Sequence, residues 1–291
     1  MATSRIYDAP VPAMFRVGCP MWANPSWLGR YLDANAPSPL AAYAAVFPAV
    51  EGNTTFYATP KRAVTERWAA HTSATFRFVC KLPQEVTHRR RLMDCADPLA
   101  AFFDALEPLG ERAELLTVQL PPTFDPSGIE LLAVFLRGLP GDHRYAVEVR
   151  HPGFFDGAAN EAALAAVLTA SGVEQVTLDT RMLHSRRANS PAEQQEQDTK
   201  PPLPVRFRAI GDHPIMRIIG TDDADETIAA WQDWLPIVAA WLAEGRSPTV
   251  FLHTPDNVNT PGFARRFHDD LVRRCPTIAP LPEMSTQTLF T

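Results

Sequence analysis

The 291-residue sequence lacks the features that mark several classes of protein. It has no apolar run of about 18 residues, the length that a membrane-spanning helix needs. Its start, MATSRIYDAPVPAM, has no apolar core of a secretory signal. Four cysteines (Cys19, Cys80, Cys95 and Cys275) lie far apart without a C-x-x-C pair, which argues against a zinc ribbon and a disulfide framework. We therefore expect a cytoplasmic protein with reduced thiols.

Nucleotide-binding fingerprints and a strong charge are also missing. No G-x-G-x-x-G follows the first β-rich run, and no G-x-x-x-x-G-K-[ST] occurs. The net charge of −6 and the pI of about 5.8 do not support a nucleic-acid partner or an anionic membrane. The sequence favours a small-molecule ligand and no membrane association.

Alternation of β-rich and helical segments dominates what is present. Eight β-rich runs alternate with helical patterns at about the length of one βα unit. The runs are residues 15–19, 50–53, 76–82, 115–120, 145–150, 175–180, 215–220 and 249–253. Strict alternation predicts a parallel sheet covered by helices. Eight units predict an α/β protein with a single (β/α)8 TIM-type barrel domain over residues 1–291, with the barrel itself over about 15–276.

Two segments depart from this pattern. Residues 181–213, between the sixth and seventh β-rich runs, form a long polar insertion rich in Gln, Ser and Pro. The composition is typical of a flexible insertion, whereas the position among long βα loops favours a lid over the barrel. The C-terminal tail, 277–291, shows no clear pattern, and we expect it to pack on the barrel exterior or to fray.

A helical pattern over residues 225–244 carries a stripe of large apolar side chains. Its members are Trp231, Trp234, Leu235, Val238 and Trp241. At this spacing they share one helix face, and we interpret them as core residues rather than as a ligand-binding stripe.

Polar side chains gather near the carboxyl ends of the predicted strands. In a barrel, alternate strand residues face the lumen, and catalytic groups lie at the carboxyl ends. Residue parity predicts the following as lumen-facing: Glu51, Asn53, Lys81, Gln119, Glu148, Arg150, Asp179, Arg217 and His253. The same parity predicts that Val147, Val149, Val176 and Leu178 face the helices.

Three carboxylates and three cations in this set predict mutual pairing, because an isolated buried charge is costly. One hypothesis is a structural ionic core, as in a non-enzymatic ligand-binding or scaffold protein. Another is an enzyme (a hydrolase, lyase or isomerase) in which Glu and His side chains do acid–base chemistry on a small polar or anionic substrate. The candidate catalytic residues are Glu51, Glu148, His151, Asp179 and His253. The candidate substrate-binding residues are Trp22, Asn53, Tyr57, Lys81, His88, Arg89, Gln119, Arg150 and Arg217.

A third hypothesis is a metal-assisted nuclease or phosphoesterase. The basic run THRRRL, 87–92, is typical of a solvated face, but at a barrel rim it can also hold an anion. The loop at the usual barrel phosphate site, GTDDADE at 220–226, is acidic and would repel one. The His and carboxylate residues at strand ends leave a divalent metal open as a cofactor. No H-E-x-x-H motif supports it, and Arg150 and Arg217 would compete for the carboxylates.

Several motifs together resemble the YecE-like family, catalogued as domain of unknown function 72. They are GCPMW (18–22), WLGRY (27–31), VEGNTTFYATP (50–60), the segment 65–92, VQLPPTF (118–124) and YAVEVRHPGFF (145–155). The resemblance covers about residues 15–275 and implies a TIM-type barrel with no established reaction or cofactor. The family pattern covers Trp22, Glu51, Asn53, Thr55, Tyr57, Lys81, Thr87, His88, Gln119, Glu148, Arg150 and His151.

The chain departs from the family pattern in two places. Where the family has R-x-H-G at the seventh strand, this chain has Arg217-Ile218-Ile219-Gly220. Where the family has an aromatic-rich run and paired Asn at the eighth, this chain has His253 and Asn257. The His missing at Ile219 weakens any mechanism that relies on it. Two interpretations stay open: His253 compensates from the next strand, or the activity is altered in this chain.

Overall fold

One parallel sheet of eight strands forms the centre of the molecule in this computed structural model, which describes residues 13–284. The strands are β1 (Arg16–Gly18), β2 (Ala49–Gly52), β3 (Arg77–Lys81), β4 (Leu115–Gln119), β5 (Arg144–Glu148), β6 (Glu174–Asp179), β7 (Ile215–Ile219) and β8 (Thr249–His253). Each overlaps a predicted β-rich run, and β2, β5 and β6 begin one residue before it. Their order, β1-β8-β7-β6-β5-β4-β3-β2, is that of a TIM-type barrel and confirms the predicted fold class. Most of the N-terminal stretch without a signal pattern (1–12) and the end of the tail (285–291) lie outside the described residues.

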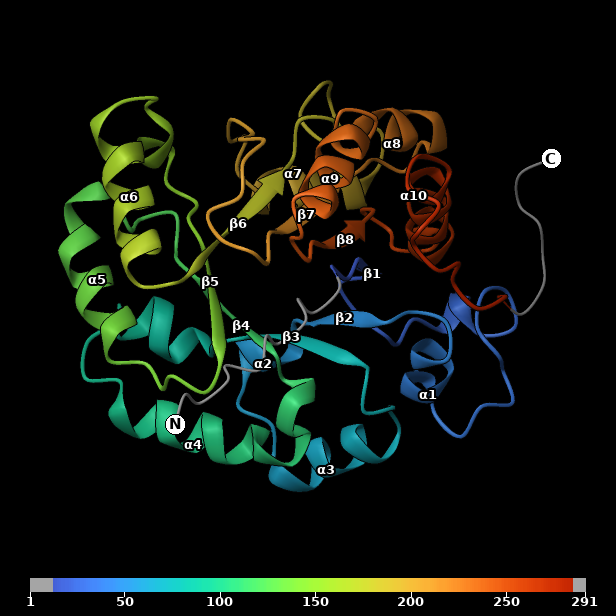
Figure 1. The fold of residues 1–291 in the computed structure, drawn as a ribbon, viewed down its shortest axis with the longest axis horizontal. Helices are drawn as coiled ribbons and strands as arrows, with labels where there is room; N and C mark the ends of the chain where they lie inside the picture. Colours follow the sequence, from blue (N-terminus) through green and yellow to red (C-terminus); the bar gives the residue numbers. More distant parts are fainter. Residues whose placement is uncertain (1–12, 285–291) are drawn as a thin grey trace, which may run out of the picture.

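Ten α-helices of the described region surround the sheet (Figure 1). They are α1 (Pro39–Ala44), α2 (Thr54–Tyr57), α3 (Arg62–Ala70), α4 (Ala96–Leu106), α5 (Ile129–Arg137), α6 (Ala159–Ala170), α7 (Pro191–Thr199), α8 (Ala224–Ala230), α9 (Trp234–Ala243) and α10 (Thr260–Arg274). Local sequence sets several starts. At α1 the Ser38 side chain accepts the Ala41 N–H, and Pro39 supplies the fixed φ of a first turn.

The barrel closes between β1 and β2. The Glu51 N–H donates to the Cys19 carbonyl at 3.1 Å. The Tyr43 hydroxyl ties the same strands together from the helix layer, since it accepts from the Cys19 N–H and donates to the Ala49 carbonyl. A Cβ on Gly18 would overlap that carbonyl, so the close approach requires glycine.

The barrel interior has three layers. At the amino ends of the strands, Glu114 pairs with Arg16, Arg77 and Arg144 at 3.4, 3.3 and 2.8 Å. At the carboxyl ends lie the charged residues of the mouth. Between the two charged layers is a buried apolar layer made of Ala49, Val79, Leu115, Ala146, Val176, Ile215 and Phe251. These apolar side chains fill the barrel and separate its two charged ends.

Strand β6 has the opposite orientation from the predicted one. Val176 belongs to the interior apolar layer, and Leu178 packs with Ile219 of β7 on the lumen side. Asp179 points instead to the helix layer, where it accepts from Trp234 Nε1 at 2.8 Å and pairs with Arg181. The prediction that Asp179 faces the lumen was therefore wrong. Strand β5 follows the prediction: Val147 and Val149 belong to the large apolar core outside the barrel.

The tryptophan stripe is buried, as predicted, but Trp231 lies in the turn between α8 and α9, and the other members lie on α9. Trp231 donates to Asp270 of α10 and Trp234 donates to Asp179 of β6, so the two indoles need different directions. Three residues apart on one continuous helix, they would share a face. The turn between α8 and α9 interrupts the helix, so the two indoles can point toward different partners.

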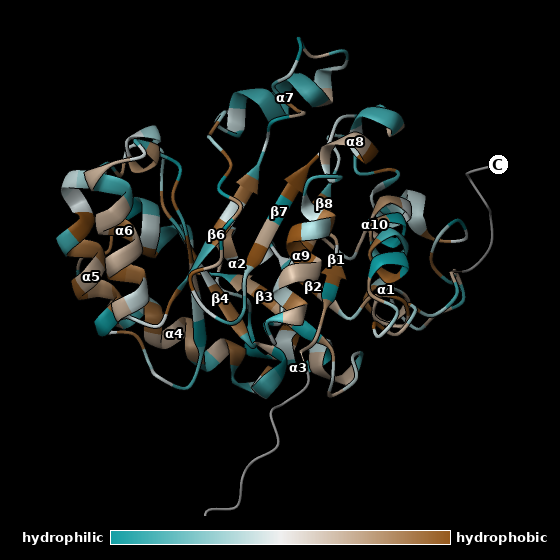
Figure 2. Ribbon diagram, turned by 45° about the horizontal axis from the view of Figure 1, so that its top comes forward, coloured by the Kyte–Doolittle hydropathy of each residue, from teal (hydrophilic) through white to brown (hydrophobic). Residues whose placement is uncertain are grey.

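Residues 181–213, which we call the strap, cross the carboxyl ends of the strands. Figure 2 shows α7 of the strap standing beyond the ends of β6 and β7. Hydrogen bonds hold the strap in place: Thr180, the residue before it, donates to the Pro201 carbonyl, and His184 Nε2 contacts the Lys200 carbonyl at 2.8 Å. Leu183 and Leu203 are buried. The strap is therefore polar in composition, but it contains a helix and is held by specific hydrogen bonds.

The position of Asp179 generates a test. We expect Asp179→Ala to lower the free energy of unfolding by about 3 kcal/mol, because it leaves Trp234 and Arg181 without their buried acceptor. Asp179→Asn keeps an oxygen for Trp234, so its loss is expected to be smaller. Urea unfolding measures both. A variant with unchanged stability would contradict this structural role.

Candidate functional site at the barrel mouth

A cavity of about 650 Å³ lies at the carboxyl ends of the strands, a size that suits a small molecule. Strand residues form its base, the loop after β1 and helix α2 form one wall, and α7 forms another. Its lining includes Trp22, Glu51, Asn53, Phe56, Tyr57, Lys81, Gln84, His88, Gln119, Arg150, Gln195, Glu196, Thr199, Lys200, Arg217, His253 and Asn257.

Arg217 of β7 connects two carboxylates across the mouth. Its Nε lies 2.8 Å from Glu51 of β2, and its Nη1 lies 3.3 Å from Glu148 of β5. Glu148 also accepts from Arg150 Nε at 2.7 Å. Glu51, Glu148 and Arg217 are each at most 4% exposed. The two carboxylates are thus fully engaged in charged hydrogen bonds, which are the strong kind.

Lys81 lies on the other side of Glu51. Its Nζ donates to Gln119 Oε1 at 2.7 Å and lies 3.6 Å from Glu51 Oε1. Asn53 donates to the second oxygen of Glu51 at 3.0 Å. The Glu51 carboxylate therefore orders three neighbours: Lys81, Asn53 and Arg217.

The strap adds a second ionic group to the mouth. Lys200, just after α7, pairs with Glu196 one helical turn earlier. Glu196 Oε2 lies 3.8 Å from His253 Nε2 at the end of β8. His253 Nδ1 is buried and has no hydrogen-bond partner among the described residues. An amine, a carboxylate and an imidazole thus lie together at the cavity wall.

Burial and crowding by cations shift the pKa values of these groups. Burial, followed by Arg217, lowers the pKa of Lys81 to about 8 and that of Lys200 to about 7. Burial, with Lys200 next, holds the pKa of His253 well below its ordinary value, so this imidazole is neutral. Burial alone would raise the pKa of Glu148, but Arg150 and Arg217 outweigh it and hold the pKa far below the usual range.

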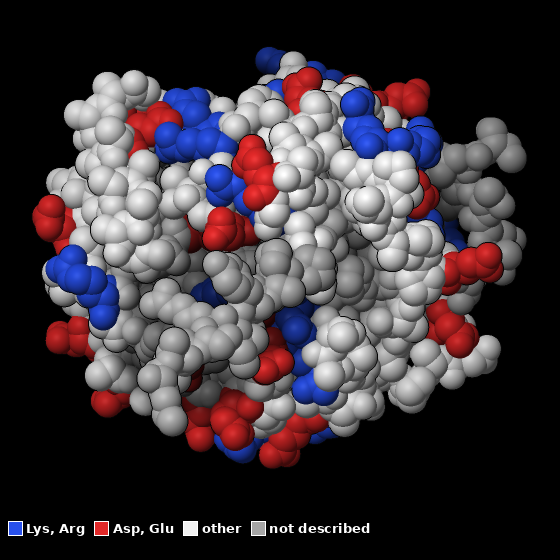
Figure 3. All heavy atoms as spheres, in the orientation of Figure 1, with Lys and Arg blue, Asp and Glu red and all other residues white. Residues whose placement is uncertain are grey.

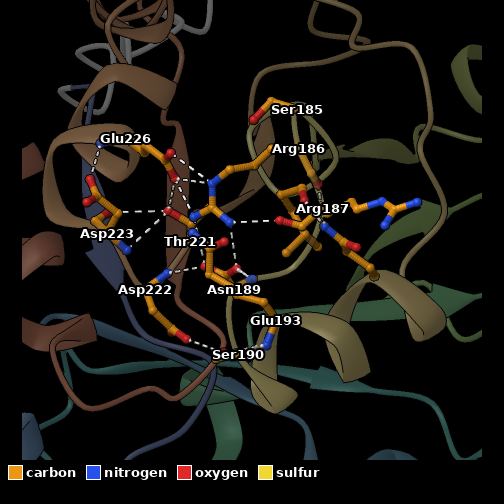
Figure 4. Close-up of polar contacts among 12 residues, drawn as sticks. Ser185, Arg186, Arg187, Asn189, Ser190, Glu193, Thr221, Asp222, Asp223 and Glu226 are labelled. Carbon is orange, nitrogen blue, oxygen red and sulfur yellow. Dashed lines mark hydrogen bonds and ion pairs between the residues drawn. The ribbon is translucent and has the colours of Figure 1, made fainter.

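A cluster around Arg186 fixes the strap to the barrel (Figure 4). The guanidinium lies between Glu193 of α7, at 2.8 Å, and Glu226 of α8, at 2.7 Å. Arg186 and backbone N–H groups hold the pKa of Glu193 down at about 2. Ser190 donates to Asp222 at 2.7 Å. The acidic loop 220–226 therefore anchors the strap.

Most predicted site residues reach the cavity. Those lining it are Trp22, Glu51, Asn53, Tyr57, Lys81, His88, Gln119, Arg150, Arg217 and His253. Glu148 is completely buried beneath them. Three others lie elsewhere. Asp179 faces the helix layer, and His151 accepts from the Gly153 N–H to cap a short turn. Arg89 has an exposed side chain that pairs with Glu85.

The strap residues of the site, Gln195, Glu196, Thr199 and Lys200, were not predicted. Gln195, Glu196 and Thr199 belong to the polar helix α7, and Lys200 directly follows it. This segment carries no motif, and it reaches the mouth because the Arg186 cluster docks α7 there. The signal available in the sequence was the complementary charge of Arg186 and the acidic loop 220–226.

The described region shows no metal-binding cluster and no membrane-spanning helix. Among residues 13–284, no three His, Cys, Asp or Glu side chains lie together as a metal site would require. No helix there is long and apolar enough to cross a membrane. On the face seen in Figure 3, basic and acidic side chains are interspersed, without a continuous basic surface. All four cysteines are free, and burial raises the pKa of the Cys80 thiol to about 12.

Fold and site together define a TIM-type barrel with a charged pocket at the carboxyl ends of its strands. The chain belongs to the family of proteins of unknown function DUF72, whose pattern matches residues 16–286. UPF0759 protein YecE of Escherichia coli O157:H7 is 37% identical over 275 residues, which cover 94% of this chain and 99% of the relative. UPF0759 protein YunF of Bacillus subtilis is 34% identical over 92 residues, 30% of this chain and 33% of that protein.

Solved structures of the family have the same fold. A DUF72 family protein from Enterococcus faecalis superposes with a TM-score of 0.66 at 16% identity, covering 96% of this chain and all of that chain. One from Thermotoga maritima gives 0.62 at 21% identity, covering 89% and 99%.

Glu148 is expected to contribute to stability in a pH-dependent way. Its folded pKa lies below the unfolded value of about 4.3, so its contribution is present above that pH and is lost as the pH falls further. Glu148→Gln should therefore lower the free energy of unfolding by about 3 kcal/mol at pH 7. The gap to wild type should narrow below about pH 4. Urea unfolding at pH 7, 5 and 3.5 measures this, and a constant gap would contradict it.

The Arg186 cluster predicts how firmly the strap is docked. Arg186→Gln should speed backbone hydrogen exchange in residues 190–200 by about tenfold or more, since charged hydrogen bonds contribute about 1.5–3 kcal/mol each. Arg187→Gln is a matched control, because the neighbouring Arg187 side chain points away from the cluster in Figure 4. Equal exchange in both variants would show that Arg186 does not hold α7.

Proposed function

We propose that this protein is an enzyme that binds a small anionic substrate at the barrel mouth and transfers a proton there through a lysine amine. The observation that carries the proposal is the charge balance of the cavity. Lys81, Arg150, Arg217 and Lys200 face three carboxylates, Glu51, Glu148 and Glu196. When all are ionised, one positive charge remains uncompensated, and an anionic ligand would neutralise it in a largely buried setting.

The lowered pKa values of the two lysines favour the amines over the carboxylates for proton transfer. A general acid or base works best when its pKa lies near the working pH. Glu148 is held ionised by two arginines, whereas the pKa values of Lys81 and Lys200 lie near 8 and 7. In this proposal Glu148 orients Arg150 and Arg217, the arginines hold the anion, and a lysine handles the proton.

Acetate tests the anion site, because it stays a monoanion between pH 6 and 9. We expect its affinity to fall as the pH rises through 7 to 8, since Lys200 and then Lys81 lose their positive charge, whereas a site made of arginines alone would not titrate. Calorimetric titration at pH 6, 7, 8 and 9 measures the affinity. A flat profile would contradict a role for the lysines.

Arg150→Gln should weaken acetate binding by about tenfold at pH 6.5, as expected for loss of a charged hydrogen bond. Arg89→Gln is the matched control, because Arg89 lies on a rim loop of the barrel with its side chain exposed and outside the cavity. Equal weakening in both variants would indicate a general charge effect and would count against the proposed site.

A further inference from the structure

Lysine is rare in this chain, and its distribution is uneven. Of the 27 basic side chains, three are lysines: Lys61, Lys81 and Lys200. Lys61 is exposed just before α3, whereas Lys81 and Lys200 both line the mouth cavity. A position that needs only a cation can be served by arginine, which the chain uses elsewhere. Arginine cannot lose its proton, so a lysine in the cavity provides an amine that arginine cannot replace.

The two cavity lysines differ in how their amines are held. Lys81 donates to Gln119 and lies beside Glu51, at the base of the cavity and beneath the ligand space. Lys200 enters from the wall. Its backbone is fixed by the contacts of His184 with its carbonyl and of its own N–H with Glu196. Its side chain meets Glu196, with the neutral His253 adjacent. Lys200 is therefore the amine that has both a carboxylate and a neutral imidazole close to it.

We propose that Lys200 is an imine-forming residue, which attacks the carbonyl carbon of a small carbonyl compound whose anionic group is held by Arg150 and Arg217. The inference rests on the proposed anion site and adds the substrate class, an anionic aldehyde or ketone such as a 2-oxo acid. A desolvated lysine beside other cations is the type of amine that forms Schiff bases.

The chemistry balances without an oxidant or a further reactant. The neutral amine adds to the carbonyl carbon, and proton transfer from nitrogen to oxygen gives a carbinolamine. Protonation of its hydroxyl by an acid group allows one water molecule to leave as the C=N bond forms. Glu196 lies next to both the amine and His253, so it is positioned to relay these protons.

Amine reactivity supports Lys200 over Lys61. With a pKa near 7 instead of 10.5, about half of the Lys200 side chains are neutral at pH 7, against about one in 3,000 for an ordinary lysine. The lower basicity also reduces nucleophilicity, which offsets part of this gain. A rate advantage of about tenfold or more remains expected for Lys200.

Reductive trapping tests the inference directly. The full-length protein is incubated at pH 7 with pyruvate and cyanoborohydride, which reduces an imine to a stable secondary amine. Peptide mass spectrometry then reports the label on each of the three lysines. We expect labelling of Lys200 at least about tenfold faster than of Lys61. Labelling that is no faster than at Lys61, or that falls on Lys81 instead, would overturn the assignment.

Two controls separate this inference from the proposed anion site. Lys200→Arg keeps the charge and should abolish the fast label, while Lys61→Arg should leave it unchanged. Acetone at the same concentration offers a carbonyl without a carboxylate. If acetone labels Lys200 as fast as pyruvate does, the amine assignment stands and the anion site is contradicted. If acetate binds as proposed and Lys200 stays unlabelled by pyruvate, the anion site stands and the imine inference fails.

Discussion

The ion pairs that Arg217 makes with Glu51 and Glu148 are the interaction on which the mouth depends. They join β2, β5 and β7 across the lumen, so the guanidinium fixes strands that have no direct backbone hydrogen bonds to one another. Buried charges of this kind persist only when each finds a partner. The positions of Lys81, Asn53 and Arg150 follow from this, because each uses an oxygen of Glu51 or Glu148.

This constraint changes which side chains are available for chemistry. A carboxylate that is shared between arginines is a strong acceptor and a poor proton carrier. Burial, together with the cations that hold this carboxylate, lowers the pKa values of the amines nearby and makes them easier to deprotonate. The same electrostatic arrangement therefore holds Glu148 ionised and brings the pKa values of Lys81 and Lys200 close to neutral pH.

The barrel and most of its mouth were predictable from the sequence, because strand periodicity and eight βα repeats constrain both. Strand β6 shows where parity fails. A barrel strand is buried on both faces, so Val176 and Leu178 suit either layer. Asp179 has its partner on Trp234, 55 residues away in the chain. A polar residue at the end of a strand therefore does not have to face the lumen, as Asp179 shows.

The strap illustrates a second limit. Its polar residues carry no periodic apolar face, and Lys200 becomes a mouth residue only through the docking of Arg186 between Glu193 and Glu226. Such an interaction joins segments that are distant in sequence, and each charge taken alone resembles an ordinary surface residue. The sequence alone therefore did not predict that Arg186 docks α7 at the mouth.

The apolar layer at mid-barrel, with Phe251 among its members, has a consequence for molecular traffic. Among residues 13–284, these apolar side chains fill the barrel axis, so a polar ligand that enters the mouth is expected to leave again on the mouth side. One ligand then cannot enter the cavity while another is leaving it. Under the proposed function, a product formed at the base of the cavity would block the next substrate until it had left, and accumulating product would compete with fresh substrate.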